Sequence, residues 1–289
     1  KMKNVLVTGG AGFIGSNLIK KLIENSINVT SIDNYSTGSH VNEIEGPNYI
    51  NDDITNIDKL DTNYDVCFHL AAQSRVQPSF VDPEESLRVN VLGTSKVMEW
   101  AKQNNVKVVY AGSSSKHHTP SDSPYAMYKY LGEEVCKLYK NSYDVNVEIS
   151  MFYNVYGPGE NIDEKFGNVI GIWTAKIKKN QPIPIVGDGE QKRDFIHVYD
   201  LVDGLIKIAE SPIISNDAWE LGTGINYSIN ELFTFFRKKN DIEPIYIPDQ
   251  PGNYRKTLRI NDDALKLLKW KPNDRLKSHI ENLNIWKTF

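Results

Sequence analysis

Short apolar runs alternate with helical patterns over the first half of the chain. Six runs are apolar and bounded by turn residues, as buried strands are: Val5–Thr8, Val29–Asp33, Tyr49–Asp52, Val66–Leu70, Val106–Ala111 and Val145–Met151. Helical spacing of apolar residues covers Ile14–Asn25, Glu84–Asn104 and Tyr125–Tyr143. This alternation predicts an α/β fold whose parallel, doubly wound sheet has right-handed crossovers and occupies residues 1–154.

The pattern changes after Asn154, where Gly and Pro become frequent. Helical patterns persist at Val169–Lys179, Leu201–Glu210, Ile229–Lys239 and Asp262–Leu268. We expect a smaller, mixed α/β substrate-binding lobe made of residues 155–196 and 223–289, with a segment near 197–222 returning to the sheet. A ligand is expected in the cleft at the carboxyl ends of the strands.

Composition narrows the classes of partner. The 289 residues carry 33 basic and 37 acidic side chains, a net charge of −4, and no block of Lys or Arg. Neither nucleic acid nor an anionic membrane is therefore expected as a partner. No apolar run approaches the length of a membrane span, and Cys67 and Cys136 are expected to be buried free thiols, so we expect a cytoplasmic protein. No metal site is expected, because His117 and His118 lack a third ligand.

Three glycines stand at the first strand–helix junction, in the run Thr8–Gly15 (TGGAGFIG). Gly9 allows a tight turn, Gly12 lets the backbone approach a pyrophosphate, and Gly15 lets the helix pack closely on the strand. The following helix presents unpaired N–H groups to phosphates at its N-terminus. The pattern predicts a dinucleotide site on a Rossmann-type sheet.

Asp33 ends the second strand, 18 residues after Gly15. A carboxylate at this place accepts hydrogen bonds from both adenosine-ribose hydroxyls and repels a 2′-phosphate. No Arg follows in residues 34–38. The sequence therefore favours NAD over NADP.

Tyr125 and Lys129 are four residues apart on a predicted helix, so they share one face. A phenol titrates near 10 when free, and a cation about 4 Å away contributes roughly 4 kcal/mol toward its ionised form at an effective dielectric constant near 20. Ser113 follows the fifth strand and can hydrogen-bond the reacting oxygen, with Ser114 as the alternative. These residues predict proton transfer to and from a substrate hydroxyl.

Together these segments resemble the NAD-dependent epimerase/dehydratase family of extended short-chain dehydrogenases/reductases, in a pattern similar to the UDP-sugar 4-epimerases. The resemblance implies catalytic roles for Ser113, Tyr125 and Lys129. It also implies cofactor contacts from Gly9, Gly12, Phe13, Ile14, Gly15, Asp33, Asn34, Gly38, Asp53, Ile54, Leu70, Ala71, Ala72, Gln73, Asn90, Tyr125 and Lys129. It further implies substrate contacts from Ser114, Asn154, Val169, Arg193 and Arg255.

The chain departs from the family pattern in several places. The loop between Ser113 and Tyr125 is about half as long as is usual in the family, and it carries His117 and His118. Met151 and Gln250 occupy places where the family commonly has Arg. Arg255 is expected to replace the guanidinium lost at position 250. The resemblance therefore does not identify the sugar.

The reaction follows from what the chain lacks. Dehydratases and decarboxylases of this family carry acidic residues directly after the catalytic Ser or Thr, where this chain has Ser114 and Ser115. We therefore expect a nucleotide-sugar 4-epimerase acting on a UDP-hexose or UDP-N-acetylhexosamine with tightly bound NAD. A dehydratase, a 4-keto-sugar reductase and a non-catalytic NAD-sensing protein are the alternatives. The helices near 84–104 and 125–143 resemble those of a family dimer interface, which predicts a homodimer.

Overall fold

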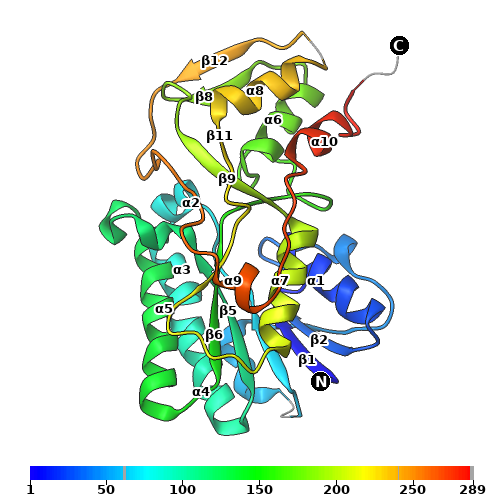
Figure 1. The fold of residues 1–289 in the computed structure, drawn as a ribbon, viewed down its shortest axis with the longest axis vertical. Coiled ribbons are helices and arrows are strands. Elements are labelled where there is room, and N and C mark those ends of the chain that lie inside the picture. Colours follow the sequence, from blue (N-terminus) through cyan, green and yellow to red (C-terminus); the bar gives the residue numbers. More distant parts are fainter. Residues whose placement is uncertain (61–62, 240, 287–289) are drawn as a thin grey trace.

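A seven-stranded parallel sheet forms the larger part of the computed structural model (Figure 1), which describes residues 1–60, 63–239 and 241–286. Its strand order is β10-β6-β5-β4-β1-β2-β3. The strands are β1 (Asn4–Thr8), β2 (Asn28–Asp33), β3 (Asn48–Asn51), β4 (Val66–His69), β5 (Lys107–Ser113), β6 (Val147–Phe152) and β10 (Trp219–Leu221). The order reverses next to β1, at the place where a doubly wound sheet binds its ligand.

Helices cover both faces of this sheet. On one face lie α3 (Pro83–Leu87), α4 (Thr94–Asn104) and α5 (Pro124–Tyr143), and on the other α1 (Phe13–Glu24) packs beside α7 (Val198–Glu210) (Figure 1). Apolar side chains from the strands and from these helices share one core, in which Leu6, Phe68 and Val108 are fully buried. The predicted fold, a doubly wound α/β sheet, is confirmed.

The helix expected over Glu84–Asn104 is interrupted. Residues Arg88–Gly93 form a π-helical stretch between α3 and α4. The stretch contains Asn90, whose buried side chain turns toward the neighbouring loop, as described below. A single π-helical turn inside a longer helix leaves the apolar pattern on either side of it α-helical, so the sequence pattern did not distinguish it.

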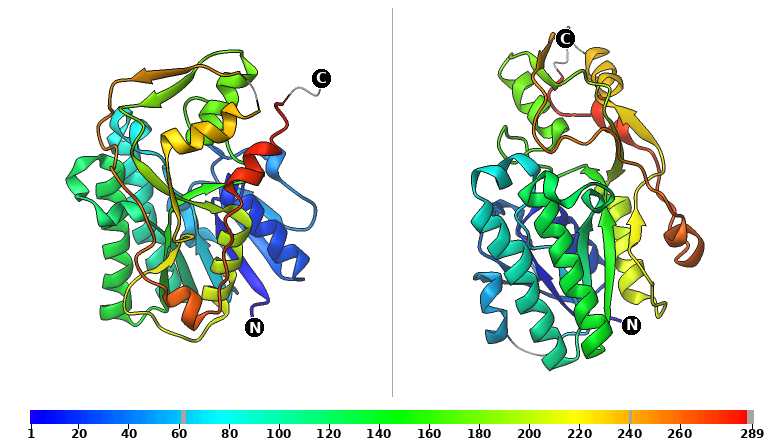
Figure 2. Two further views of the ribbon diagram at one scale, coloured as in Figure 1. Left: turned by 45° about the horizontal axis from the view of Figure 1, so that its top comes forward. Right: turned by 90° about the vertical axis from the view of Figure 1, so that its left-hand side faces the viewer.

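A smaller lobe stands over the carboxyl ends of the strands, as Figure 2 shows from two further sides. It holds a three-stranded sheet, β11-β9-β7, and a two-stranded sheet, β12-β8. Its strands are β7 (Asn154–Tyr156), β8 (Ile183–Val186), β9 (Lys192–His197), β11 (Asn226–Ser228) and β12 (Pro244–Ile247). Its helices are α6 (Val169–Lys178), α8 (Ile229–Arg237) and α10 (Leu276–Glu281), which pack around Trp173, Leu232 and Phe236.

The chain passes between the two parts more often than the sequence suggested. Residues Ala264, Leu268 and Trp270, on and after α9 (Asp263–Leu267), belong to the core of the large sheet. Trp270 Nε1 donates a hydrogen bond to the carbonyl oxygen of Asp200 on α7. The range 223–289 therefore contributes to both cores, and the division into an NAD-binding domain and a lobe stays a prediction.

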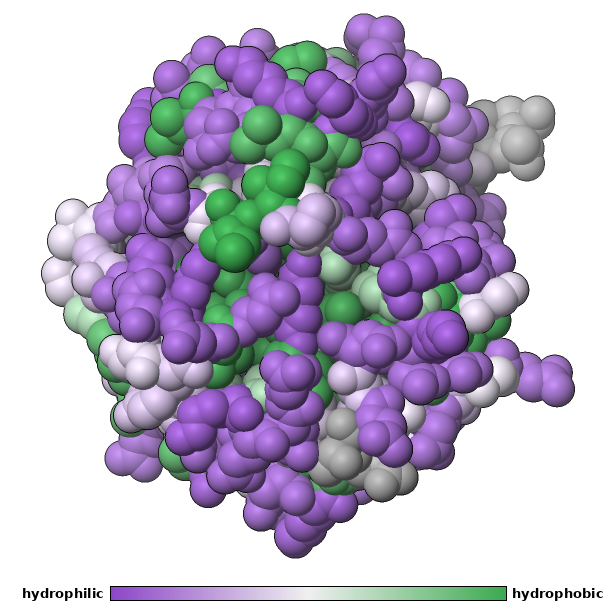
Figure 3. Space-filling model, turned by 60° about the horizontal axis from the view of Figure 1, so that its bottom comes forward, coloured by the Kyte–Doolittle hydropathy of each residue, from purple (hydrophilic) through white to green (hydrophobic). Residues whose placement is uncertain are grey.

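The surface is predominantly polar. Figure 3 shows one face on which hydrophilic residues predominate and hydrophobic residues gather in a narrow central band. Within the described residues, no helix is both long and apolar enough to span a membrane. The remaining short helices are α2 (Val76–Val81) and several 3₁₀ turns, all in the loops around the sheet.

Candidate active site

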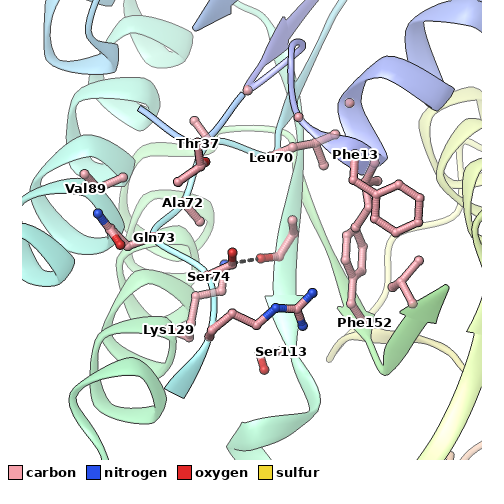
Figure 4. Close-up of a pocket in the computed structure, with 18 of the residues that line it drawn as sticks. Phe13, Thr37, Leu70, Ala72, Gln73, Ser74, Val89, Ser113, Lys129 and Phe152 are labelled. Atoms are coloured by element: carbon pink, nitrogen blue, oxygen red, sulfur yellow. Dashed lines mark hydrogen bonds between the residues drawn. The ribbon is translucent and has the colours of Figure 1, made fainter. Parts of the chain in front are cut away.

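One pocket runs along the carboxyl ends of the strands, between the large sheet and the lobe. Most of the expected site residues line it: Gly9, Gly12, Phe13, Ile14, Gly15, Asp33, Asn34, Asp53, Ile54, Leu70, Ala71, Ala72, Gln73, Ser113, Ser114, Tyr125, Lys129, Asn154 and Arg193. In the close-up, Phe13, Leu70 and Thr37 lie at one end, and Lys129 and Ser113 lie at the other (Figure 4). The pocket thus joins the glycine-rich turn to the Tyr–Lys pair.

The glycine-rich turn has room only for glycine at two of its positions. A Cβ atom on Gly9, whose φ is +75°, would lie 2.9 Å from the backbone nitrogen of Ala71, and one on Gly15 would lie 2.2 Å from the carbonyl oxygen of Gly9. Gly12 lines the pocket, and a Cβ atom there would meet only the carbonyl oxygen of Gly9, at 3.4 Å. No side chain caps the N-terminus of α1, so its first N–H groups remain for a ligand. This cradle fits the pyrophosphate of a dinucleotide.

The Asp33 carboxylate is held in place by the backbone. Its Oδ2 accepts a hydrogen bond from the N–H of Ala11 at 3.0 Å, and its Oδ1 accepts one from the N–H of Tyr35 at 2.8 Å. Each oxygen keeps a lone pair for a hydroxyl in the pocket. Gly38 packs against this carboxylate, where a Cβ atom would lie 3.0 Å from Asp33 Oδ2, and it is not among the residues that line the pocket.

If Asp33 binds the ribose diol, the protein should bind NAD much more tightly than NADP. Asp33→Asn keeps the shape of the side chain and removes its charge. It should lower the ratio of NAD affinity to NADP affinity by about tenfold, which corresponds to the free energy of one hydrogen bond to a charged group. Calorimetric titration of both cofactors into both proteins measures the ratio. Equal affinity of the unmodified protein for NAD and NADP would contradict the role of Asp33.

The loop after β4 is positioned by Asn90. Asn90 Oδ1 accepts a hydrogen bond from the N–H of Gln73 at 2.9 Å, and Asn90 Nδ2 donates one to the carbonyl oxygen of Gln73 at 3.1 Å. Asn90 is buried and lies outside the pocket lining. It therefore acts on the pocket through Gln73, by holding the loop over the cofactor end.

Asp53 and Ile54 form the pocket wall beyond β3. Asp53 Oδ1 pairs with Nη1 of Arg88 at 2.9 Å and also accepts the N–H of Thr55. The Arg88 guanidinium holds the pKa of the Asp53 carboxyl well below its usual range. Asp53 therefore stays ionised, and Asn34 Nδ2 donates to its second oxygen at 3.3 Å.

Lys129 points from α5 toward the pocket floor. Its Nζ donates a hydrogen bond to the carbonyl oxygen of Ala111 at 2.6 Å and lies 5.0 Å from the centre of the Tyr110 ring. Burial lowers its pKa from 10.5 to about 8.

Ser123 caps the same helix through the N–H of Ala126, and the N–H of Tyr125 donates to Ser79 Oγ. These caps fix where the helix starts, and therefore which turn presents Tyr125 and Lys129.

Ser113 ends β5 at the same end of the pocket. Its Oγ accepts a hydrogen bond from the N–H of Ser115 at 3.1 Å, which caps a short 3₁₀ turn. The hydroxyl hydrogen stays available to a substrate oxygen, because this cap uses only a lone pair. Ser114 lines the pocket beside it, whereas Ser115 is buried behind.

Arg193 is the guanidinium on the lobe side of the pocket. Its Nη2 donates to Asn253 Oδ1 at 2.8 Å and its Nη1 to the carbonyl oxygen of Lys192. Burial lowers the pKa of Arg193 to about 10. Asn253 thus orients a half-buried guanidinium whose partners are neutral oxygens, an arrangement suited to a phosphate.

Two expected substrate residues lie outside the pocket lining. Val169 is the first residue of α6, and its neighbour Asn168 caps that helix through the N–H of Gly171. Arg255 is exposed and forms two hydrogen bonds with Asp188, at 2.8 and 2.9 Å. Arg255 does not replace the guanidinium missing at position 250 in this structure.

The shortened loop reaches the pocket indirectly. The ring of His118 stacks on Tyr254, with centroids 4.0 Å apart, and Tyr254 lines the pocket. His117 lies 3.6 Å from the buried carboxylate of Glu220.

Sequence reasoning missed two residues that line the pocket, Tyr254 and Arg75. The one sequence feature that could have indicated Arg75 is its position directly after the Ala-Ala-Gln-Ser stretch that follows the fourth strand.

The fold and this pocket define an NAD-dependent enzyme that oxidises and reduces a carbon bearing a hydroxyl group. A sequence model of the NAD-dependent epimerase/dehydratase family matches residues 5–222, and the chain belongs to this family. The predicted class, an NAD-dependent nucleotide-sugar epimerase of the extended short-chain dehydrogenase/reductase type, is confirmed at this level.

Three relatives illustrate the similarity. The UDP-glucose 4-epimerase of Mycolicibacterium smegmatis is 32% identical over 292 residues, covering 92% of this chain and 93% of that protein. The UDP-glucose 4-epimerase of Thermotoga maritima, solved with UDP-glucose, has a TM-score of 0.90 at 29% identity and covers 98% of this chain and 97% of its own. The UDP-glucuronic acid 4-epimerase of Bacillus cereus, solved with UDP-glucuronic acid and NAD, has a TM-score of 0.89 at 26% identity and covers 96% of each chain.

Proposed function

We propose that this protein is a UDP-sugar 4-epimerase. The observation that carries the proposal is the distribution of acids in the pocket. Among the described residues that line it, the acidic ones are Asp33, Asp52 and Asp53, all on the side of the glycine-rich turn and β3. Beside Tyr125 the lining offers hydroxyls and cations, without the acid that a dehydration or decarboxylation would use. We infer UDP as the nucleotide because the relatives described above are UDP-sugar 4-epimerases.

The residues at this end have distinct roles in the proposed reaction. Tyr125 takes the proton of the C4 hydroxyl, and Ser113 donates a hydrogen bond to the same oxygen. Lys129 stabilises the phenolate of Tyr125 by its charge. NAD, when bound, supplies a hydride acceptor that later returns the hydride. The sugar turns over as a 4-keto form, so that the hydride would return to the opposite face of C4 and invert that carbon. Tyr125 gives the proton back to the C4 oxygen.

The remaining site residues hold the substrate while its sugar turns. Arg193 binds the diphosphate as a planar fork, which a Lys could not reproduce, and Asn154 contributes an amide beside it. A fixed diphosphate keeps the 4-keto sugar from leaving between the two half-reactions.

Incubation of separate nucleotide sugars with the enzyme and catalytic NAD tests the reaction. The panel contains UDP-glucose, UDP-galactose, their N-acetyl forms and UDP-glucuronic acid, read by NMR. Interconversion at C4 without net change in NADH absorbance would support the epimerase. A 4-keto-6-deoxy product would move the assignment to a dehydratase, and stoichiometric NADH consumption on a keto-sugar would move it to a reductase. Tight NAD binding with no turnover and no sugar binding would favour a sensor.

We also propose that the protein is a homodimer through the face formed by α3, α4 and α5. Large apolar side chains are exposed on this face, among them Leu87, Leu92 and Leu138. Light scattering at micromolar concentration should give the mass of two chains. A monomer under these conditions would contradict the proposal.

A further inference from the structure

Arg75 stands in the substrate end of the pocket in an unusual backbone conformation. It follows the loop after β4 and lines the pocket with Tyr125 and Lys129. Its φ is +84°, a region that residues other than glycine rarely adopt and that costs about 1–3 kcal/mol. Its Nε donates a hydrogen bond to the carbonyl oxygen of Phe166 at 3.2 Å.

The guanidinium of Arg75 has no carboxylate partner. Among the described residues no acidic oxygen lies within 4 Å of it, whereas Arg88 pairs with both Asp53 and Glu85. Burial lowers the pKa of Arg75, and the nearby Tyr125 and the acids at 160 and 163 oppose that shift by raising it. Arg75 is half-buried, and a cation partly withdrawn from water without an anion is costly, so an anionic ligand relieves that cost.

The two acids whose charges act on Arg75 each have one oxygen engaged elsewhere. Glu160 Oε2 pairs with Nε2 of His279 at 2.7 Å, and Asp163 Oδ1 accepts the backbone N–H groups of Lys165 and Phe166. Both contacts hold the segment that supplies the Phe166 carbonyl to Arg75. The surrounding loop therefore positions Arg75 and leaves its two terminal nitrogens to the pocket.

The place of Arg75 relative to Tyr125 indicates which part of the substrate it meets. Figure 4 shows Ser74, the preceding residue, at the end of the pocket that holds Lys129 and Ser113. The proposed reaction brings C4 of the sugar to Tyr125, and C5, the next ring carbon, carries the exocyclic C6. A guanidinium beside Tyr125 is thus within reach of the C6 group, while Arg193 on the lobe side serves the diphosphate.

We propose that Arg75 binds a carboxylate at C6, and that the preferred substrate is therefore a UDP-hexuronic acid. This inference rests on the proposed 4-epimerase function and narrows the sugar expected from the sequence, a neutral hexose or N-acetylhexosamine. A guanidinium fork matches a carboxylate with two parallel hydrogen bonds and gains little from the hydroxymethyl group of a neutral hexose.

Binding and turnover of UDP-glucuronic acid and UDP-glucose test this proposal separately. Binding is measured by calorimetry on NAD-loaded protein carrying Tyr125→Phe, which blocks turnover, and rates are measured by NMR on the otherwise unmodified enzyme. Arg75→Met should weaken binding of UDP-glucuronic acid by about 100-fold, the value of hydrogen bonds to charged groups, and change that of UDP-glucose less than threefold. Arg75→Lys should recover part of the loss, because it restores the charge without the fork.

Arg237→Met is the matched control. It removes the same charge from the exposed end of α8, outside the pocket lining, and should change neither affinity. Equal weakening of both sugars by Arg75→Met, with an unchanged melting temperature, would assign Arg75 to the diphosphate and overturn the proposal. Unmodified enzyme that binds UDP-glucose as well as UDP-glucuronic acid would overturn it too. Selective binding without epimerisation of any sugar would instead contradict the 4-epimerase function and leave the carboxylate site standing.

Discussion

Tyr125→Phe should keep NAD bound and slow 4-epimerisation by roughly 10²–10⁴-fold, the usual contribution of a positioned acid–base group. The substitution removes one oxygen atom and leaves the ring, so the packing of α5 should not change. The start of this helix is fixed by Ser123 and Ser79, which contact the backbone at residues 126 and 125 and not the phenol. The loss should therefore appear in kcat rather than in stability.

Tyr128→Phe provides the control for this variant. Tyr128 lies on the same helix and outside the pocket lining, so it should retain full activity. Both variants are compared by NMR on the sugar that the unmodified enzyme turns over best, and NAD content is read by absorbance after release. A Tyr125→Phe enzyme with more than a tenth of the normal rate would exclude Tyr125 as the proton acceptor.

The sequence predicted those features of the site whose geometry is set by residues close together in the chain. The run TGGAGFIG forms a turn and a helix start within eight residues, and the close contact that requires Gly15 lies within that turn. Tyr125 and Lys129 lie on one helix, so their spacing alone places them on the same face. Short-range geometry of this kind is readable from sequence without any tertiary contact.

The residues that sequence reasoning missed depend on contacts between distant segments. Arg75 is oriented by Phe166, which is 91 positions away, and Tyr254 lies over the loop at residue 118. Arg255 was expected in the pocket, yet Asp188 holds it at the surface. The residues beside Arg255 in the sequence do not distinguish it from an arginine that lines the pocket. Its partner, Asp188, comes from a distant part of the chain.

Lys129→Met should lower kcat by about 10³-fold. A unit charge about 4 Å from a phenolate contributes roughly 4 kcal/mol at an effective dielectric constant near 20, and about 1.4 kcal/mol corresponds to a factor of ten in rate. Methionine nearly matches the length of the lysine stem, so the filled volume under Tyr110 is kept. Lys137→Met, on the outer side of the same helix, should have no such effect.

The same residue should make stability depend on pH in a direction opposite to activity. The pKa of Lys129 is about 8 in the folded protein, below the 10.5 of an ordinary lysine. Between these values the unfolded chain binds more protons than the folded one, so the free energy of unfolding rises with pH. Below pH 8 the cost of the buried charge is fully present. Urea unfolding of apoprotein should show this rise, and Lys129→Met should abolish it.

Activity should follow the charge of Lys129 itself. As pH rises through about 8, Lys129 loses its proton, the phenolate of Tyr125 loses its stabilising cation, and kcat of the unmodified enzyme should fall. Lys129→Met has no such group, so its low rate should climb with pH as hydroxide removes the phenolic proton unaided. Lys137→Met should keep the falling alkaline limb, because the charge beside Tyr125 is intact. Parallel pH profiles for the unmodified enzyme and Lys129→Met would show that Lys129 positions the helix without acting on the phenol, since a purely structural residue changes the rate equally at every pH.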